Sequence, residues 1–354
     1  MALLRSFIPH EAPRTFEEDL HGRLGNGLYN ALFRPVALKL WGDPQTLDVK
    51  LSAGRVQTPK LGEILAGVLG RKKTSEFEAL TFHYPKGGLQ EIWNAIKSKI
   101  SLHGRIYTNT TVTGFDLTNN RVCAIKIKGP EGEGMLPVGD GDFIASTLPL
   151  GILIKLLPQI FNKADLAEAG SIITLNDLLL VFLHVDKSSL IDESWVFVPD
   201  PEIAFHRISE QESFDPSMTP NGSIICCEIM NNKMRPMSAQ SDAELIELAL
   251  EGMKKMGYKC FTVKSSRVIR LPRSYPVYHP GYQEVLDRLL SKLDGIENLR
   301  TIGRQGAFNY IGTLDAMDIG YGYARWRQAQ RTGNGNDGDW QAERKRTSHY
   351  PVLD

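Results

Sequence analysis

The sequence lacks an excess of charge of either sign. Its 354 residues include 41 Lys and Arg and 41 Asp and Glu, so the formal net charge is zero. A neutral chain creates no overall field that would draw it to nucleic acid or to an anionic membrane. We therefore expect a small-molecule substrate and no nucleic-acid partner.

Cysteine is scarce as well. The four cysteines form no CxxC pair and no metal-finger spacing, so we expect no metal site. Cys226 and Cys227 are adjacent in a predicted strand, where consecutive side chains point to opposite faces, and a redox pair is not expected there. Reduced thiols of this kind are typical of a cytoplasmic protein.

Long apolar runs are also missing. Lys155 and Asp177 interrupt the longest apolar stretches, so the sequence predicts no integral membrane segment. The sequence contains no Ser/His/Asp pattern, no HExxH and no GxGxxG turn in its N-terminal part, and its eight histidines support no catalytic assignment. These absences exclude the commonest metal-dependent and nucleophilic hydrolases.

What is present is ordinary for a globular protein: 42% hydrophobic and 23% charged residues, with room for two or three domains. Residues 17–36 predict a helix with Leu20, Leu24, Leu28 and Leu32 on one face, and Pro35 near its end. A second helical region is expected through Leu69. After Tyr84–Gly88, a further helix carries one apolar stripe, formed by Leu89, Ile92, Trp93, Ile96 and Ile100.

The following part of the chain, up to about residue 295, predicts strands and helices. Short strands are expected at 105–111, 121–128 and 142–146, with a loop at 129–141. An antiparallel sheet is expected from 172–185, 194–198, 203–208, 223–229 and 260–269. One helix is predicted to begin with a capping box at Ser241 and to end at Gly257. Another helix has apolar residues at helical spacing, namely Tyr282, Val285, Leu286, Leu289, Leu290 and Leu293.

Residues 298–331 are the most informative stretch, because they predict a strand, a glycine turn, a loop and a helix that begins near Asp315. Gly303 and Gly306 allow backbone conformations and close approaches that other residues do not. The start of a helix can hold the anionic part of a cofactor through its unpaired N–H groups. The alternative is a strand-to-helix connection whose glycines only permit tight packing.

An ordered set of short motifs between about Phe16 and Tyr323 resembles the flavin-dependent amine oxidase superfamily. Within it, the chain is most similar to the branch of protoporphyrinogen oxidase-like proteins and UDP-galactopyranose mutase. The segments that carry this resemblance are Leu40–Gly42, Leu51–Ser52, Arg55–Val56, Tyr84–Gly88, Thr110–Val112, Ser146–Pro149, Phe205–Ile208, Tyr275–Tyr278, Gly303–Tyr310 and Leu314–Met317.

The resemblance implies a mixed α/β (α+β) FAD-dependent fold with two domains. An incomplete Rossmann-like FAD domain would comprise 76–150 and 296–331, and a substrate domain with an antiparallel sheet would comprise 151–295. Residues 1–75 would form a mainly helical region, and 332–354 a flexible tail. The implied FAD-binding residues are Val112, Thr147, Pro149, Gly303, Arg304, Gly306, Asp315, Ala316 and Met317.

One departure concerns the start of the family pattern. Members begin with a strand, a GxGxxG turn and a helix that hold the FAD pyrophosphate, and Met1 falls after that unit. We therefore expect a truncated or split product, a mispredicted start or a shortened relative. FAD binding by this chain then depends on the closing segment or on a partner chain that supplies the missing half.

The resemblance implies an FAD-dependent oxidoreductase that transfers hydride from its substrate to the flavin. This chemistry needs little acid and base machinery from the protein. The alternatives are a flavin-dependent sugar-nucleotide mutase and a cofactor-free remnant that is inactive alone. For the mutase, Arg207 and Arg273 would bind the diphosphate, with Tyr275, Tyr278 and Tyr310 as hydrogen-bonding groups. Each arginine could instead form a structural ion pair.

Overall fold

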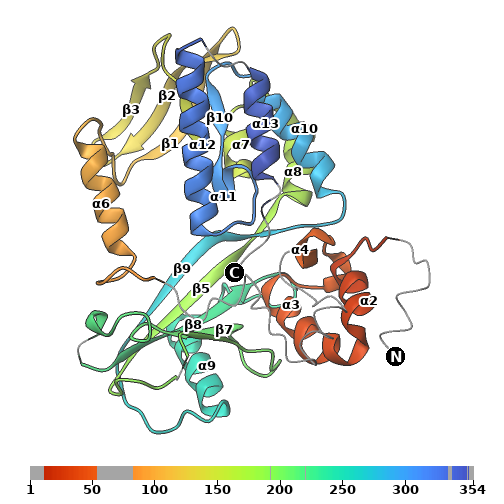
Figure 1. Cartoon of the computed structure of the whole chain (residues 1–354), viewed down its shortest axis with the longest axis vertical. Coiled ribbons are helices and arrows are strands. Elements are labelled where there is room, and N and C mark those ends of the chain that lie inside the picture. Colours follow the sequence, from red (N-terminus) through yellow and green to blue (C-terminus); the bar gives the residue numbers. More distant parts are fainter. Residues whose placement is uncertain are drawn as a thin grey trace, which may run out of the picture.

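The computed structural model describes residues 12–53, 83–191, 193–219, 221–333, 337–348 and 350 (Figure 1). The second predicted helical region, through Leu69, and the Arg55–Val56 motif lie outside these residues. The first part of the described chain forms a helical unit. Its elements are α2 (Phe16–Leu28), the π-helix η1 (Tyr29–Phe33), α3 (Arg34–Leu40), the short 3-10 helix η2 (Pro44–Thr46) and α4 (Lys50–Ala53).

The helix predicted at 17–36 exists, but it is not continuous. Gly25 adopts φ 75° and ψ 164° inside α2, and a π-helical turn follows before Pro35 enters the first turn of α3. These breaks change the direction in which the later apolar side chains point. Leu20 is therefore buried, whereas Leu28 and Leu32 are both 45% exposed, and the four leucines do not share one buried face.

A helix and a three-stranded sheet follow. They are α6 (Gln90–Ser101), β1 (Thr111–Thr118), β2 (Arg121–Gly129) and β3 (Gly132–Pro137), with antiparallel order β1-β2-β3. Two predictions were wrong here. The strand expected at 105–111 begins only at Thr111, and the expected loop at 129–141 contains β3, because Gly129 and Gly132 pair across a tight turn that Gly132 permits at φ 105°.

A small parallel sheet joins two distant parts of the chain. β4 (Ile144–Ser146) pairs with β10 (Leu299–Thr301) in parallel register. Helices surround this pair in Figure 1, and their bounds are α7 (Leu150–Lys155), α8 (Lys163–Ile172), α10 (Tyr282–Asp294), α11 (Gly303–Gly306), α12 (Thr313–Arg331) and α13 (Asp337–Thr347). All six apolar residues predicted on α10 are buried, which confirms that helix.

The predicted antiparallel sheet is confirmed. It has the order β6-β7-β8-β5-β9, and its strands are β5 (Thr174–Val185), β6 (Trp195–Phe197), β7 (Arg207–Glu210), β8 (Ser223–Asn231) and β9 (Val263–Val277). A short 3-10 helix, η3 (Pro216–Met218), precedes β8. α9 (Asp242–Lys255) covers this sheet and begins with the predicted capping box of Ser241 and Glu244.

Two large hydrophobic clusters meet along β5. Leu178 belongs to the first cluster, which also takes residues from α2, α7, α10 and β10, while Leu179, Val181 and Leu183 belong to the second, between the five-stranded sheet and α9. Figure 1 shows β5 and β9 running from the upper helices into the lower sheet. The mixed α/β fold with an antiparallel sheet agrees with the predicted fold class.

The end of the chain differs from the flexible tail expected at 332–354. Its described part forms α13, which lies beside α12, and Trp340 is only 4% exposed within a third cluster that includes Trp326. The Trp340 indole N–H donates to Asp294 on α10 at 3.1 Å. The glycine and asparagine run that suggested flexibility precedes this helix, so composition alone misled the prediction.

Candidate functional site

The candidate site lies where β4 and β10 end. Parallel strands have their carboxyl ends at the same edge, so the chain leaves β4 through Thr147 and leaves β10 through Gly303 at neighbouring positions. A Cβ atom placed on Gly303 would be 3.8 Å from Cγ2 of Thr147. Thr147 is exposed, and Pro149 two residues later is the N-cap of α7. The structure thus brings together two segments, far apart in the chain, that were predicted to share a site.

The two predicted glycines have different reasons to be glycine. Gly303 has φ 83°, a conformation that favours glycine, and it is half-buried. Gly306 is buried, and a Cβ atom there would lie 2.9 Å from both the Ser146 carbonyl oxygen and Oγ1 of Thr301. Gly306 therefore allows tight packing between the two loops, which was the alternative interpretation of this motif.

Arg304 is held by two aromatic rings. Its guanidinium lies 4.5 Å from the ring centre of Tyr310 and 5.1 Å from that of Tyr275, and it donates a 2.5 Å hydrogen bond to the Ile311 carbonyl. Both rings are almost completely buried, and their centres are 5.5 Å apart. Cation–π contacts of this kind fix the position of a positive charge. Three predicted site residues therefore form one cluster.

Two further aromatic residues connect this cluster to its surroundings. Trp41, in the Leu40–Gly42 motif, meets the Tyr310 ring edge-on at 6.5 Å and so links the N-terminal helical unit to the cluster. The Tyr278 hydroxyl accepts a 2.8 Å hydrogen bond from the Tyr310 N–H and donates to the Phe308 carbonyl. Burial raises the pKa of Tyr278 to about 12, so this hydroxyl stays protonated.

The start of α12 is the second part of the site. The helix begins at Thr313, two residues before the predicted start, and Asp315 accepts a 3.0 Å hydrogen bond from the Gly312 N–H. Ala316 is exposed, Met317 is half-buried and Leu314 is 81% exposed. The positive end of the helix dipole therefore reaches the surface beside a carboxylate that caps it.

The remaining predicted residues lie farther from this cluster. Arg207 on β7 forms a bidentate ion pair with Glu228, at 2.8 and 2.9 Å, as in the alternative interpretation. Arg273 on β9 is exposed, has φ 54°, and accepts at its carbonyl a hydrogen bond from Gln305 next to Arg304. Val112 pairs with Ile127 in the three-stranded sheet and is half-buried.

A pocket of about 600 Å³ lies on the other side of the Tyr278 and Phe308 rings. Residues of α10 and α13, including Asp287 and Arg344, line it, and Tyr278 is the one predicted residue in its lining. No pattern in the sequence pointed to this pocket, because α13 was expected to be flexible. Among the described residues, no helix is both long and apolar enough to span a membrane.

No protein-family model matches the chain, but solved structures do. It aligns with a reduced UDP-galactopyranose mutase (TM-score 0.72, 19% identity), covering 86% of this chain and 64% of that one. A putative protoporphyrinogen oxidase from Exiguobacterium sp. 255-15 aligns with TM-score 0.63 and 17% identity, covering 86% and 65%. An oxidoreductase from Methanosarcina mazei aligns with a TM-score of 0.55 and 15% identity, covering 86% of this chain and 65% of that one.

These similarities are too low in identity to transfer an activity, but they establish the architecture. The chain spans less than two thirds of the length of each of these three proteins. The resemblance inferred from the sequence is confirmed at the level of the fold: this chain has the fold shared by a UDP-galactopyranose mutase, a putative protoporphyrinogen oxidase and an oxidoreductase.

Proposed function

We propose that the chain is part of an FAD-dependent oxidoreductase of the amine oxidase and protoporphyrinogen oxidase-like type. The observation that carries the proposal is the meeting of Thr147, the Gly303 turn and the start of α12 around the parallel pair β4–β10. Loops at the carboxyl ends of parallel strands are where such sheets bind nucleotide cofactors. The fold shared with known oxidoreductases supports the same proposal.

The residues present fit one side of an FAD molecule. The Gly303 turn and the exposed Thr147 leave backbone accessible, and the start of α12 offers a partial positive charge to an electron-rich ring or phosphate. The residues that we propose to line the FAD are Val112, Thr147, Pro149, Gly303, Arg304, Gly306, Asp315, Ala316 and Met317.

When bound, FAD would accept the hydride. The chain's own residues would position the cofactor and exclude water, and Arg304 would supply a fixed positive charge because Tyr275 and Tyr310 hold its guanidinium. Both rings are buried, so they pack against Arg304 and fix its position. The α12 dipole would stabilise negative charge on the flavin ring.

A sugar-nucleotide mutase is the second candidate, and one observation favours it: Arg273 is exposed next to the Gln305–Arg304 segment, where it could reach a diphosphate. Arg207 is a weaker candidate because Glu228 already accepts two hydrogen bonds from its guanidinium. The two candidates differ in whether a substrate causes net reduction of the flavin, because the mutase reaction involves no net oxidation.

The test is to purify the protein with FAD and titrate the folded chain with the cofactor while recording the flavin spectrum. We expect saturable binding that Thr147→Phe abolishes and that Thr118→Phe, at an exposed position in β1, leaves unchanged. Anaerobic bleaching by amines or porphyrinogens supports the oxidoreductase. Turnover of UDP-sugars without net oxidation supports the mutase. A folded protein that binds no FAD, either alone or with an added polypeptide that carries a strand, a GxGxxG turn and a helix, contradicts both.

A further inference from the structure

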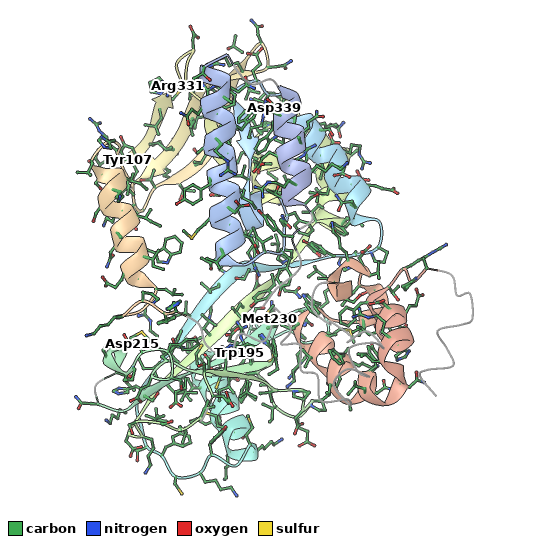
Figure 2. All side chains as sticks on the ribbon, in the orientation of Figure 1. Tyr107, Trp195, Asp215, Met230, Arg331 and Asp339 are labelled. Carbon is green, nitrogen blue, oxygen red and sulfur yellow. The ribbon has the colours of Figure 1, made fainter. Side chains whose placement is uncertain are left out.

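The pocket of about 600 Å³ between α4, α10 and α13 is separate from the proposed flavin surface. Among the residues that the structure describes, those proposed to line FAD take no part in its lining. Asp339, labelled in Figure 2, lies in the first turn of α13, and lining residues follow it along this helix towards α4. The pocket volume is within the range of small-molecule sites in proteins, about 300–1,000 Å³.

Side-chain contacts tie the elements around this pocket to one another. The Lys50 ammonium on α4 donates to the side-chain carbonyl of Gln283 on α10 at 3.1 Å. The Asn309 amide donates to the carbonyl of the last residue of α13 at 2.8 Å, and Arg344 of α13 forms an ion pair with Asp294 of α10. The pocket is therefore preformed, which lowers the entropy cost of binding a ligand.

The inner wall of the pocket is apolar and closely packed. The Tyr278 and Tyr282 rings stack with their centres 4.3 Å apart and their planes 3° from parallel, and the Phe308 ring centre is 5.6 Å from that of Tyr278. Leu286 and Leu290 complete this wall, and the five residues are only 1% to 6% exposed. A wall of this kind favours the apolar part of a ligand.

Two lining residues carry hydrogen-bond donors with spare capacity. The Lys50 ammonium has three donors, but among the described residues it bonds only to Gln283 and forms no ion pair. Burial lowers the pKa of Lys50, although the charges of Asp48 and Asp287 oppose this effect. Tyr282 is 2% exposed, burial raises its pKa, and its hydroxyl has no hydrogen-bond partner among the described residues. The Lys50 Nζ lies 5.8 Å from the Tyr282 ring centre, so both donors lie in the same part of the pocket.

The charge of the lining selects an anion. Three cationic side chains, Lys50, Arg344 and Lys345, line the pocket with the single carboxylate of Asp287. A positive ligand would meet repulsion, whereas an anion would offset the positive excess. We propose that this pocket binds an apolar organic acid. The ring or chain of the acid packs against the inner wall, and its carboxylate or phosphate accepts hydrogen bonds from Lys50 and Tyr282.

The test uses the full chain and three probes that share a naphthalene ring and differ in charge: 2-naphthoate, 2-naphthylmethanol and 2-naphthylmethylamine. Isothermal titration calorimetry at pH 7 measures their binding. We expect a Kd for 2-naphthoate below about 1 mM, as is typical of a ligand of this size. The alcohol should bind about tenfold more weakly, because it cannot form charge-assisted hydrogen bonds, and the amine should not saturate the site. Comparison with 2-naphthyl phosphate shows which head group the pocket prefers.

Two substitutions test the donors. Lys50→Met should weaken 2-naphthoate binding about tenfold or more and change binding of the alcohol by less than about twofold, because only the acid uses the charge. Lys254→Met, at an exposed position in α9, removes the same charge elsewhere and should leave both affinities unchanged. Tyr282→Phe removes one hydroxyl and should weaken acid binding about threefold to tenfold. Circular dichroism checks that each variant folds like the wild type.

A third substitution shows where the probe binds. Ala342 is exposed on α13 and lines the pocket, so Ala342→Trp should block 2-naphthoate without disturbing the core. Ala243→Trp, at an exposed position in α9, adds the same side chain away from the pocket and should have no effect.

Three results would overturn the proposal. They are equal affinity for the three charge types, no saturable binding of either acid, and acid binding that Ala342→Trp leaves unchanged, which would place the probe elsewhere on the protein. The measurement needs no flavin, so its outcome is independent of FAD binding.

Discussion

At the scale of single residues, Gly306 is the clearest test of the loop packing at the site. A Cβ atom there would lie 2.9 Å from the Ser146 carbonyl oxygen, which is backbone and cannot rotate away. We expect Gly306→Ala to lower the free energy of unfolding by about 1–3 kcal/mol, because overpacking forces the backbone to shift. Urea unfolding followed by circular dichroism measures the change.

Gly320 gives the matched control for that substitution. It lies inside α12, and a Cβ atom added there would have no neighbouring atom within 4 Å, so Gly320→Ala should stabilise the protein by about 0.5–1 kcal/mol. Equal effects of the two substitutions would show that the loops around Gly306 adjust freely, and that their tight contact is not what fixes the site.

Lys39 is a second residue with a testable property. It is 3% exposed, and its Nζ donates to the carbonyls of Val198 and Phe205 at 2.7 and 3.0 Å. Burial, followed by the nearby charge of Arg235, lowers the pKa of Lys39 from 10.5 to about 7. The folded state therefore loses this proton at a lower pH than the unfolded state does.

The sign of the pH dependence follows from that difference. Below pH 7 both states hold the proton and the destabilisation is complete, whereas between about pH 7 and 10.5 the unfolded state binds more protons and stability rises with pH. The free energy of unfolding of the wild type relative to Lys39→Met should rise by about 1–2 kcal/mol from pH 7 to 9. Urea unfolding at both pH values checks this, and a constant difference would contradict a lowered pKa.

At the scale of elements, Trp340 is the large buried side chain by which α13 packs on the protein, beside ion pairs from Arg344 to Asp294 and from Arg346 to Asp318. Trp340 packs against Trp326 with ring centres 5.3 Å apart and donates to Asp294. Trp340→Ala should remove about 3–5 kcal/mol of packing, and α13 should detach locally while the rest stays folded. Hydrogen exchange and limited proteolysis of 337–348 measure this. Trp195→Ala, at a 43% exposed position, should leave α13 protected.

The glycine inside α12 explains why the two last helices approach closely. A Cβ atom on Gly322 would overlap the carboxylate of Glu343 on α13, so the glycine permits the observed position of this flexible side chain. Glu343 in turn forms an ion pair with Arg346. The neighbour that this glycine accommodates lies on the next helix, so local spacing in the sequence does not reveal it.

At the scale of the whole molecule, β5 and β9 pass through both large clusters and should couple them. Leu183 is completely buried in the second cluster, and Leu153 is completely buried in the first. Leu183→Ala and Leu153→Ala should each lower the free energy of unfolding by about 2–5 kcal/mol, and the protein should still unfold in a single transition. Coincident unfolding curves from tryptophan fluorescence and far-UV circular dichroism test this. Two separate transitions would show that the clusters unfold independently.

The sequence allowed part of the fold to be predicted, for local reasons. The capping box at Ser241 and the apolar stripe of α10 are properties of a few neighbouring residues, and both helices form as expected. α6 was also predicted from its stripe, but the exposure of that stripe was not, because periodicity does not reveal whether a covering element exists. The hairpin at Gly132 was missed because a glycine and acidic loop looked unstructured.

The sequence by itself determined the types of most elements, the absence of charge excess, and the motif order that indicated the fold, since these depend on local spacing. Only the tertiary structure decided which residues meet. It placed Thr147 beside Gly303, held Arg304 between Tyr275 and Tyr310, and paired Arg207 with Glu228. The physical reason is that these contacts join segments far apart in the chain, and their geometry is set by how strands and helices pack rather than by neighbouring residues.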